Sequence, residues 1–242
     1  MLTKLALGTE EQYVQHAGSI IAACHKELSK RITCGVTTLE IERFTERFML
    51  ERGAFPAYKG RKGYPFAIYA SVNGMLRGGF PGTAPLSSGD MVKIEMIAGV
   101  DGGAAEFAWT YAIGEPSPLA RKLLRTAQHT LNRGIAEARV GRSAGDIIVA
   151  IHTSAAKSGC LVMNSMPDIA VHGILHRLQQ GEMRPVEQPE ELLAEGMILT
   201  IDLIVGLGAL AGDAASVEPG LATAHVKHTV AVTRSGPVVL TK

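Results

Sequence analysis

Several classes of protein are excluded by what this sequence has little of. Its 242 residues include 24 Lys and Arg against 23 Asp and Glu, a formal net charge of +1, so the chain lacks the broad basic face that binds a nucleic-acid backbone. Its three cysteines, Cys24, Cys34 and Cys160, form no CxxC pair and are odd in number, which argues against a disulfide or zinc-finger scaffold. Aromatic residues make up only 5% of the chain, so we expect a core of aliphatic strands and small-residue helix contacts.

Long hydrophobic runs are also missing. The apolar stretch ILTIDLIVGLGALAG falls short of the ~20 residues that span a bilayer, and it carries Asp202 near its middle. The first segment, MLTKLALGTEEQ, lacks the apolar core of a signal peptide. We therefore expect a cytoplasmic protein whose partners include neither nucleic acid nor a membrane. No pattern in the sequence indicates its oligomeric state.

The hydrophobic residues, 46% of the chain, are enough for a folded domain, and their spacing predicts helices and strands in mixed order. Capping residues and glycines predict helices over about 10–31, 38–53, 117–139 and 143–159. Apolar runs between turn residues predict strands over 64–72, 89–100, 106–114, and around 168–174, 197–205, 225–233 and 237–242. This order is typical of an α+β protein without regular βαβ alternation.

Recurring segments indicate two halves of similar plan. The segments GVTTLEIERFTERFMLERGA, from Gly35, and GRSAGDIIVAIHTSAAKSGC, from Gly141, each run from a loop Gly through a Thr or Ser cap to a closing Gly. The strands GDMVKIE, from Gly89, and GMILTID, from Gly196, recur at an offset within one residue of the first, and each ends in a carboxylate. We expect one domain over 1–242 with pseudo-twofold halves of about 1–115 and 116–242, and a site where the two strand carboxylates meet.

Three carboxylates lie in strands whose neighbours are apolar or small: Glu95 in VKIEMI, Glu106 in AAEFAWTY and Asp202 in ILTIDLIV. A buried ionised carboxylate is costly, so each must be paired, protonated or bound to a metal ion. His225 and Lys227 share one face of the strand HVKHTVAVT, which makes Lys227 a candidate counter-ion. For any one of these residues a salt bridge at a strand edge is the simpler explanation, but together they favour a site.

Six motifs, in order, are GVTTLE, SVNGMLRGGFP, GDMVKIEMIAGVDGG, VHGI, EGMILTID and HVKHT. Their order and spacing resemble those of methionine aminopeptidases and the wider creatinase/aminopeptidase superfamily, over nearly the whole chain from about Leu2 to Lys242. The resemblance implies the α+β pita-bread fold, a pseudo-twofold antiparallel sheet with helices on its outer face. It also implies a hydrolase whose substrate is a peptide N-terminus or a small molecule.

In that family five protein ligands hold two divalent metal ions. By this resemblance the candidate catalytic residues are Glu95, Glu106, His172, Asp202 and Lys227. The family's bridging Glu corresponds to Lys227, whose ammonium has no lone pair for a metal and repels a nearby cation. A two-metal centre is therefore not expected. The resemblance leaves open one divalent metal ion, with Glu106, His172 and Asp202 as ligands, or none.

The residues expected around the substrate also differ from those of the family. The family's substrate-contacting His corresponds to Gly78, which follows Arg77. A second family His corresponds to Gln179, with His176 near enough to replace it, and the Cys that borders the methionine pocket corresponds to Tyr69. We expect four residues to contact the substrate: Tyr69, Arg77, His176 and His225.

Three functions fit these residues. The leading one is a diverged methionine aminopeptidase-like hydrolase of an N-terminal peptide bond or a small amide bond, with at most one metal ion. The second is a metal-independent enzyme that acts on a small molecule by acid–base catalysis, as creatinase does on the same fold. The third is a non-catalytic binding module.

Overall fold

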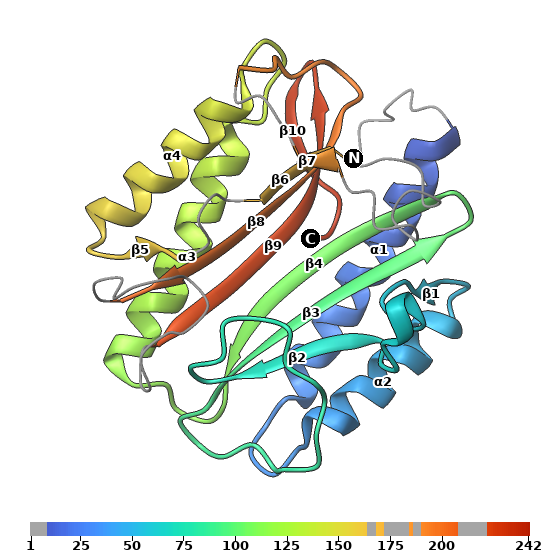
Figure 1. The fold of residues 1–242 in the computed structure, drawn as a ribbon, viewed down its shortest axis with the longest axis vertical. Coiled ribbons are helices and arrows are strands. Elements are labelled where there is room, and N and C mark those ends of the chain that lie inside the picture. The colour runs from blue at the N-terminus through green and yellow to red at the C-terminus, as the bar shows by residue number, and fades with distance from the viewer. Residues whose placement is uncertain (1–8, 164–167, 172–183, 186–189, 208–221) are drawn as a thin grey trace.

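The protein is built on one antiparallel sheet, as seen in a computed structural model that describes residues 9–163, 168–171, 184–185, 190–207 and 222–242 (Figure 1). The strands are β1 (Phe55–Pro56), β2 (Ile68–Val72), β3 (Met91–Val100), β4 (Gly103–Ala112), β5 (Leu161–Val162), β6 (Asp168–Val171), β7 (Arg184–Pro185), β8 (Ile198–Gly206), β9 (Thr223–Thr233) and β10 (Gly236–Val239). Their order is β1-β3-β4-β9-β8-β6-β7, with β2 paired to β3, β5 to β8 and β10 to β9. The long strands β3 and β4 therefore lie beside β9 and β8, which come from the other half of the chain.

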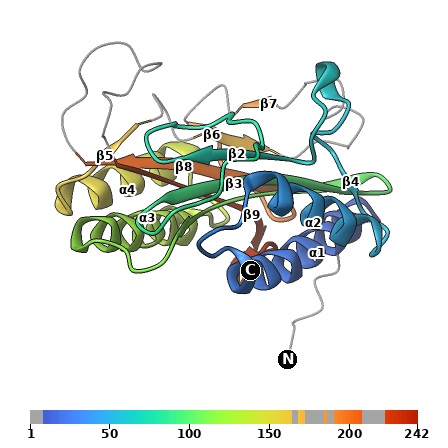
Figure 2. The same ribbon diagram turned by 90° about the horizontal axis from the view of Figure 1, so that it is seen from below.

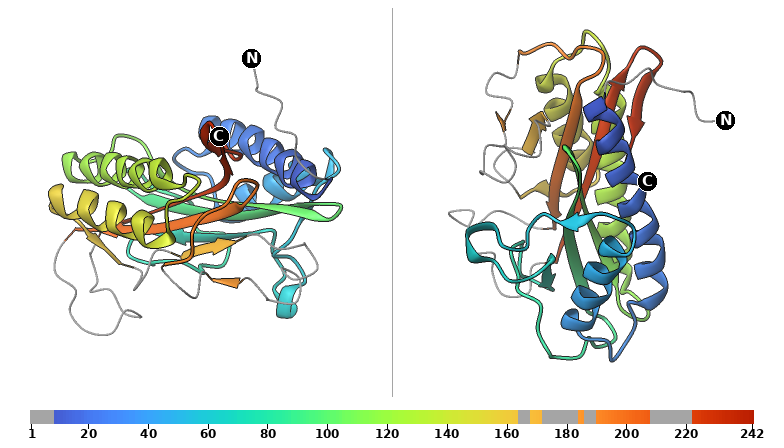
Figure 3. Two further views of the ribbon diagram at one scale, coloured as in Figure 1. Left: turned by 90° about the horizontal axis from the view of Figure 1, so that it is seen from above. Right: turned by 90° about the vertical axis from the view of Figure 1, so that its right-hand side faces the viewer.

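The helices cover one face of this sheet (Figures 2 and 3). They are α1 (Thr9–Arg31), α2 (Thr38–Leu50), α3 (Pro118–Glu137) and α4 (Ala144–Lys157), and a short 3₁₀ turn, η1, spans Arg61–Gly63. Helix α1 packs on β3 and β4, and α3 packs on β8 and β9. The expected α+β pita-bread architecture, with helices on the outer face of an antiparallel sheet, is confirmed.

Helices α2 and α4 each begin with a capping box. Thr37 accepts a hydrogen bond from Glu40 N at 3.1 Å while Glu40 accepts one from Thr37 N, and Ser143 and Asp146 repeat this exchange. Just before each cap, Gly35 N donates to Leu86 O, and Gly141 N donates to Leu193 O. These contacts tie each helix start to the segment that leads into β3 or β8, the strands that carry Glu95 and Asp202.

Two glycines allow close packing of the helices. A Cβ on Gly103 would lie 2.6 Å from the backbone N of Val14 in α1, and one on Gly134 in α3 would lie 2.7 Å from Ile151 of α4. Any residue larger than glycine at either position would clash with the neighbouring helix. Strand β4 starts at Gly103 rather than at Glu106, because the two-residue turn Asp101–Gly102 lets Gly103 pair directly with Val100.

Other boundaries differ from the sequence prediction for local reasons. The strand expected over 64–72 begins only at Ile68, because Pro65 has no N–H for the ladder and the Tyr64 hydroxyl donates to Ile68 O. Only Asp168–Val171 of the strand expected around 168–174 lies within the described residues. Among the helices of the described ranges, none is both long and apolar enough to cross a bilayer.

Candidate active site

A row of residues crosses the middle of the sheet on the face away from the helices. In the strand register Glu95 pairs with Ala108, Ala108 with Lys227, and Lys227 with Asp202. Directly opposed residues in antiparallel strands point to the same face. Because Ala108 has only a methyl group, the side chains of Glu95 and Lys227 meet across it.

Lys227 stands at the centre of a buried cluster of charges. Its Nζ lies 2.5 Å from Glu95 Oε1, 2.9 Å from Asp202 Oδ2 and 3.2 Å from Glu106 Oε2. All four side chains are buried, with Lys227 only 4% exposed. Charges so far from water are stable only when they are paired, and these form a single ion-pair network.

The charge states of the cluster follow from this pairing. Burial alone would lower the pKa of Lys227, but the carboxylates of Asp202 and Glu95 raise it well above its ordinary value. Burial would raise the pKa of Asp202 and of Glu95, but Lys227 and His225 hold both pKa values below their usual range. The lysine is therefore protonated and these two carboxylates are ionised near neutral pH.

Threonine hydroxyls join the two central strands on either side of this row. Thr110 Oγ1 accepts from His225 N at 2.8 Å and donates to His225 O at 2.9 Å. Thr229 Oγ1 does the same for Glu106, with distances of 2.8 Å and 3.0 Å. The hydroxyls take the place of ladder hydrogen bonds between β4 and β9, and they fix the backbones of His225 and Glu106.

Three more side chains complete the cluster. His225 Nε2 lies 2.6 Å from Asp202 Oδ1, and Tyr58 donates its hydroxyl hydrogen to Glu95 at 2.8 Å. Arg77, whose side chain is 44% exposed, places a guanidinium nitrogen 3.8 Å from Asp202 Oδ2. Burial and the Glu95 carboxylate raise the pKa of Tyr58 well above its ordinary value, so the phenol keeps the proton that it donates.

Buried Lys93 anchors the segment that carries Arg77. It lies two residues before Glu95 on the same face of β3, and its ammonium donates to the carbonyl oxygens of Asn73 and Met75. Burial lowers the pKa of Lys93 to about 8. Gly79 N also donates to Ser71 Oγ, so both ends of the turn between β2 and Phe80 are attached to the sheet.

Known proteins are similar to this chain in sequence and in architecture. The sequence matches metallopeptidase family M24 over residues 12–234. The chain belongs to this family. It is 33% identical over 238 residues to methionine aminopeptidase 1 of Bacillus subtilis, covering 95% of each chain, and 30% identical to the methionine aminopeptidase of Clostridium perfringens, covering 96% of each.

Solved structures agree with this family membership. The methionine aminopeptidase of Thermotoga maritima superposes with a TM-score of 0.85 at 26% identity, over 100% of both chains. The prolidase of Pyrococcus furiosus shares the fold with a TM-score of 0.77 at 19% identity, over 98% of this chain and 65% of that one. The expected resemblance to methionine aminopeptidases is confirmed over the whole M24 domain.

The structure brings together most of the residues predicted from the sequence. Glu95, Glu106, Asp202 and Lys227 form the ion-pair network, and Arg77 and His225 contact Asp202. Tyr69 pairs with Glu95 in the register of β2 and β3, and its ring lies 4.7 Å from that of Tyr58. His172 and His176 lie outside the described residues. Sequence reasoning missed Tyr58, which no motif contains.

Three side chains of the cluster are candidate ligands for a divalent metal ion, but a lysine lies beside them. Glu95, Asp202 and His225 each offer a ligand atom, and these atoms lie within 4.8 Å of one another. Carboxylate oxygens and imidazole nitrogens are common ligands of divalent ions in proteins. However, the Lys227 ammonium already pairs with Glu95 and Asp202, so a fixed positive charge lies against two of these three donors. These three side chains could hold a divalent ion, with the Lys227 ammonium beside it.

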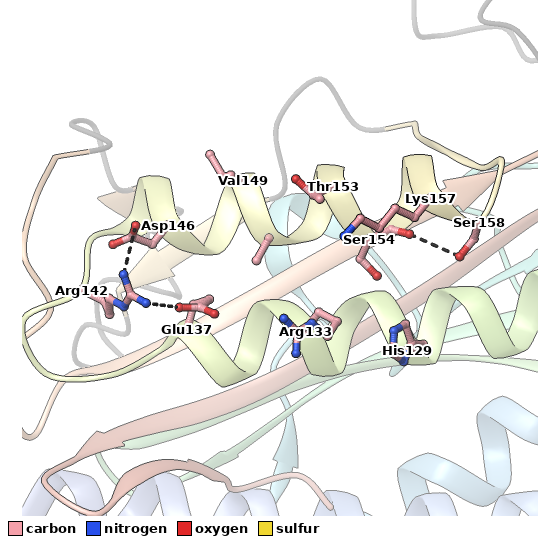
Figure 4. Close-up of a pocket in the computed structure, with 11 residues that line it drawn as sticks. His129, Arg133, Glu137, Arg142, Asp146, Val149, Thr153, Ser154, Lys157 and Ser158 are labelled. Carbon is pink, nitrogen blue, oxygen red and sulfur yellow. Dashed lines mark hydrogen bonds and ion pairs between the residues drawn. The ribbon is translucent and has the colours of Figure 1, made fainter.

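A different hollow, of about 540 Å³, lies between α3 and α4 on the outer surface (Figure 4). Arg142 contacts Glu137 at 3.2 Å and Asp146 at 3.7 Å at one end of it, and all three belong to the helix layer. None of the residues predicted for the site lines it. The candidate active site is therefore the charge cluster on the other face of the sheet.

Proposed function

We propose that this protein is a diverged methionine aminopeptidase-like hydrolase that acts on an N-terminal peptide bond or a small amide bond and uses at most one metal ion. The observation that carries the proposal is the position of Lys227 Nζ, within 3.2 Å of three buried carboxylates in a chain of family M24. Lys227 then takes the place that the family's bridging Glu occupies between two ions.

Lys227 acts as a fixed counter-ion and not as a donor to substrate. An ammonium has three hydrogens, and Glu95, Glu106 and Asp202 are placed to accept all three. With every donor in use, the lysine balances the carboxylates and sets their positions. Proton transfer therefore falls to the other side chains.

Hydrolysis needs a base that takes a proton from water and an acid that returns one to the leaving amine. Asp202 holds the buried imidazole of His225 in one orientation through the 2.6 Å contact. Glu106 Oε1 is buried and has no hydrogen-bond partner among the described residues, so it retains capacity to accept a proton. If one ion binds at Glu95, Asp202 and His225, it would polarise the scissile carbonyl and lower the pKa of a water molecule.

The charge balance favours a substrate with a free amine. Three carboxylates surround one buried ammonium, and the guanidinium of Arg77 reaches only Asp202, from a half-exposed position. A protonated amine, such as the N-terminus of a peptide, complements these carboxylates. Arg77 is placed at the open side, where it can hold an acceptor oxygen of the substrate.

The test combines metal analysis with hydrolysis. Purified protein, dialysed and then offered divalent ions, should retain no more than one equivalent, and two equivalents would contradict our interpretation of Lys227. It should cleave peptides with an N-terminal Met or small amides, and Glu106→Gln and Asp202→Asn should abolish cleavage. Glu115→Gln, at a side chain 90% exposed, is the matched control. Failure to cleave any of these with or without divalent ions would favour a binding module.

A second experiment tests the position of Lys227. The Lys227→Glu variant places four carboxylates around one point, where only a cation can relieve their repulsion. Its midpoint of thermal unfolding should rise when Mn²⁺ or Co²⁺ is added, while that of the unchanged protein should move much less. An equal response of the two proteins would count against the proposal.

One observation favours a second candidate, a metal-independent enzyme that acts on a small molecule by acid–base catalysis. The ion pairs of Lys227 neutralise the carboxylates without any bound ion. In that case hydrolysis by protein freed of metal would equal hydrolysis by protein supplied with metal. A dependence on one equivalent of metal would favour the first candidate.

A further inference from the structure

A cavity of about 410 Å³ lies between α1 and α3, on the helix-covered face of the sheet. Figure 3 shows the C-terminal end of the chain between these two helices. The floor of the cavity includes Trp109 of β4 and His228 of β9. Because neighbouring residues of a strand point to opposite faces, His228 faces this cavity while Lys227 faces the charge cluster.

The floor is aromatic. Trp109, the single tryptophan of the chain, is half-buried, and its ring is stacked at 9° on that of Phe107 with centroids 6.1 Å apart. The imidazoles of His25 and His228 lie 5.3 Å and 6.1 Å from the Trp109 ring. Such a floor favours stacking or edge contacts with a flat ring.

Two imidazole nitrogens remain for a ligand. His25 Nδ1 is 2.6 Å from the Tyr111 hydroxyl, and His228 Nδ1 is 2.8 Å from Thr241 Oγ1. Within the described ranges no hydrogen bond is formed by Nε2 of either ring, although His228 is only 7% exposed. Whichever tautomer each ring adopts, its Nε2 can donate or accept one hydrogen bond.

The walls carry no buried charge. Leu131 of α3 is apolar, Gln128 and Asn132 present amides, and no described residue lining the cavity has a carboxylate side chain. Burial lowers the pKa of both imidazoles, and that of His228 to about 4, so both are neutral near neutral pH. The two lysines, Lys26 and Lys242, are exposed at the rim. A charged ring would thus enter without a buried counter-charge.

We propose that this cavity binds a small, flat, uncharged nitrogen heterocycle, which packs against Trp109 and forms hydrogen bonds with Nε2 of His25 and of His228. The volume is in the range of small-molecule sites, and the polar groups converge on an otherwise apolar space. The site is separate from the charge cluster, so the proposal stands whether or not the protein is a hydrolase.

Ligand binding can be followed by the fluorescence of Trp109, because it is the single tryptophan of the chain. The whole protein is titrated with adenine, benzimidazole and purine, and the tryptophan is excited at the long-wavelength edge of its absorption, where these probes do not absorb. We expect a saturable change with at least one of them, and a much weaker one with benzoate and with a saturated ring such as piperazine. No saturation by any heterocycle, or equal binding of benzoate, would overturn the proposal.

Two variants place the binding in the cavity. Ala23→Leu adds an isobutyl group to the cavity wall from an exposed helical position, and binding should weaken at least about tenfold. Ala156→Leu makes the same change at an exposed position of α4 that does not line the cavity, and binding should be unchanged. Equal affinities of the two variants would place the probe elsewhere and refute the site.

Discussion

Tyr58 donates its hydroxyl hydrogen to Glu95 Oε1 at 2.8 Å, and the same oxygen lies 2.5 Å from Lys227 Nζ. One carboxylate oxygen thus accepts from a phenol and an ammonium. Hydrogen bonds to charged groups are worth more than neutral ones, and here both donors are buried. Tyr58 therefore belongs to the electrostatic balance of the cluster although it lies outside the long strands.

We predict that Tyr58→Phe folds but loses about 1.5–3 kcal/mol of unfolding free energy, because Glu95 keeps Lys227 and loses its second donor. Urea denaturation followed by circular dichroism measures the difference. Tyr13→Phe is the matched control, since its hydroxyl has no hydrogen-bond partner among the described residues, and it should change stability little. Equal losses in both variants would show that the Glu95 contact contributes nothing.

Lys227→Met should destabilise the fold by about 3–5 kcal/mol at neutral pH, because three buried carboxylates lose their counter-ion. Without the ammonium, burial raises the folded-state pKa values of Glu95 and Asp202 above their unfolded values. The folded variant then binds more protons than the unfolded chain, so its stability should rise as pH falls through those raised values. Lys122→Met, at an exposed position, should show neither effect, and further loss of stability on acidification of Lys227→Met would contradict the prediction.

His228 should make the fold sensitive to mild acid. Burial, and then the nearby His25 and Lys242, lower its pKa from 6.5 to about 4, so the unfolded chain binds the extra proton first. The stabilisation is fully present above pH 6.5 and is lost as pH falls to about 4, by up to about 3 kcal/mol. Denaturant unfolding across this window should show a shallower decline for His228→Gln, and parallel declines would exclude His228 as the cause.

Lys93→Met should loosen the turn that carries Arg77. The variant removes the ammonium that donates to the carbonyl oxygens of Asn73 and Met75, while the methionine side chain still fills the space in the sheet. Hydrogen exchange measured by mass spectrometry should become faster in peptides covering residues 73–80 and stay unchanged in those covering α3. Unchanged exchange over 73–80 would mean that the lysine does not anchor the turn.

Much of the candidate site could be predicted because the cost of burying charge can be read from sequence. Glu95, Glu106 and Asp202 stand among apolar neighbours, and the capping patterns at Thr37 and Ser143 mark the helices that precede their strands. Both kinds of signal are local, so they require no knowledge of which strands pair.

What could not be predicted depends on register. The row from Glu95 through Ala108 to Lys227 and Asp202 exists only because four strands align at one level, which no single strand encodes. In the same register His225 pairs with Ile204, and its imidazole reaches Asp202 through a side-chain contact that no motif predicts. Its contact with substrate stays a prediction. Tyr58 follows a two-residue strand, where periodicity carries no information.

Lys227 also supplies positive charge to the site from within the chain itself. An ion in such a cluster is an exchangeable solute, whose occupancy follows its free concentration and the competition of other proteins for it. A lysine is made with the chain, cannot be removed by a chelator, and is present in every copy. The counter-charge that Lys227 supplies to Glu95, Glu106 and Asp202 is thus in place as soon as β9 joins the sheet.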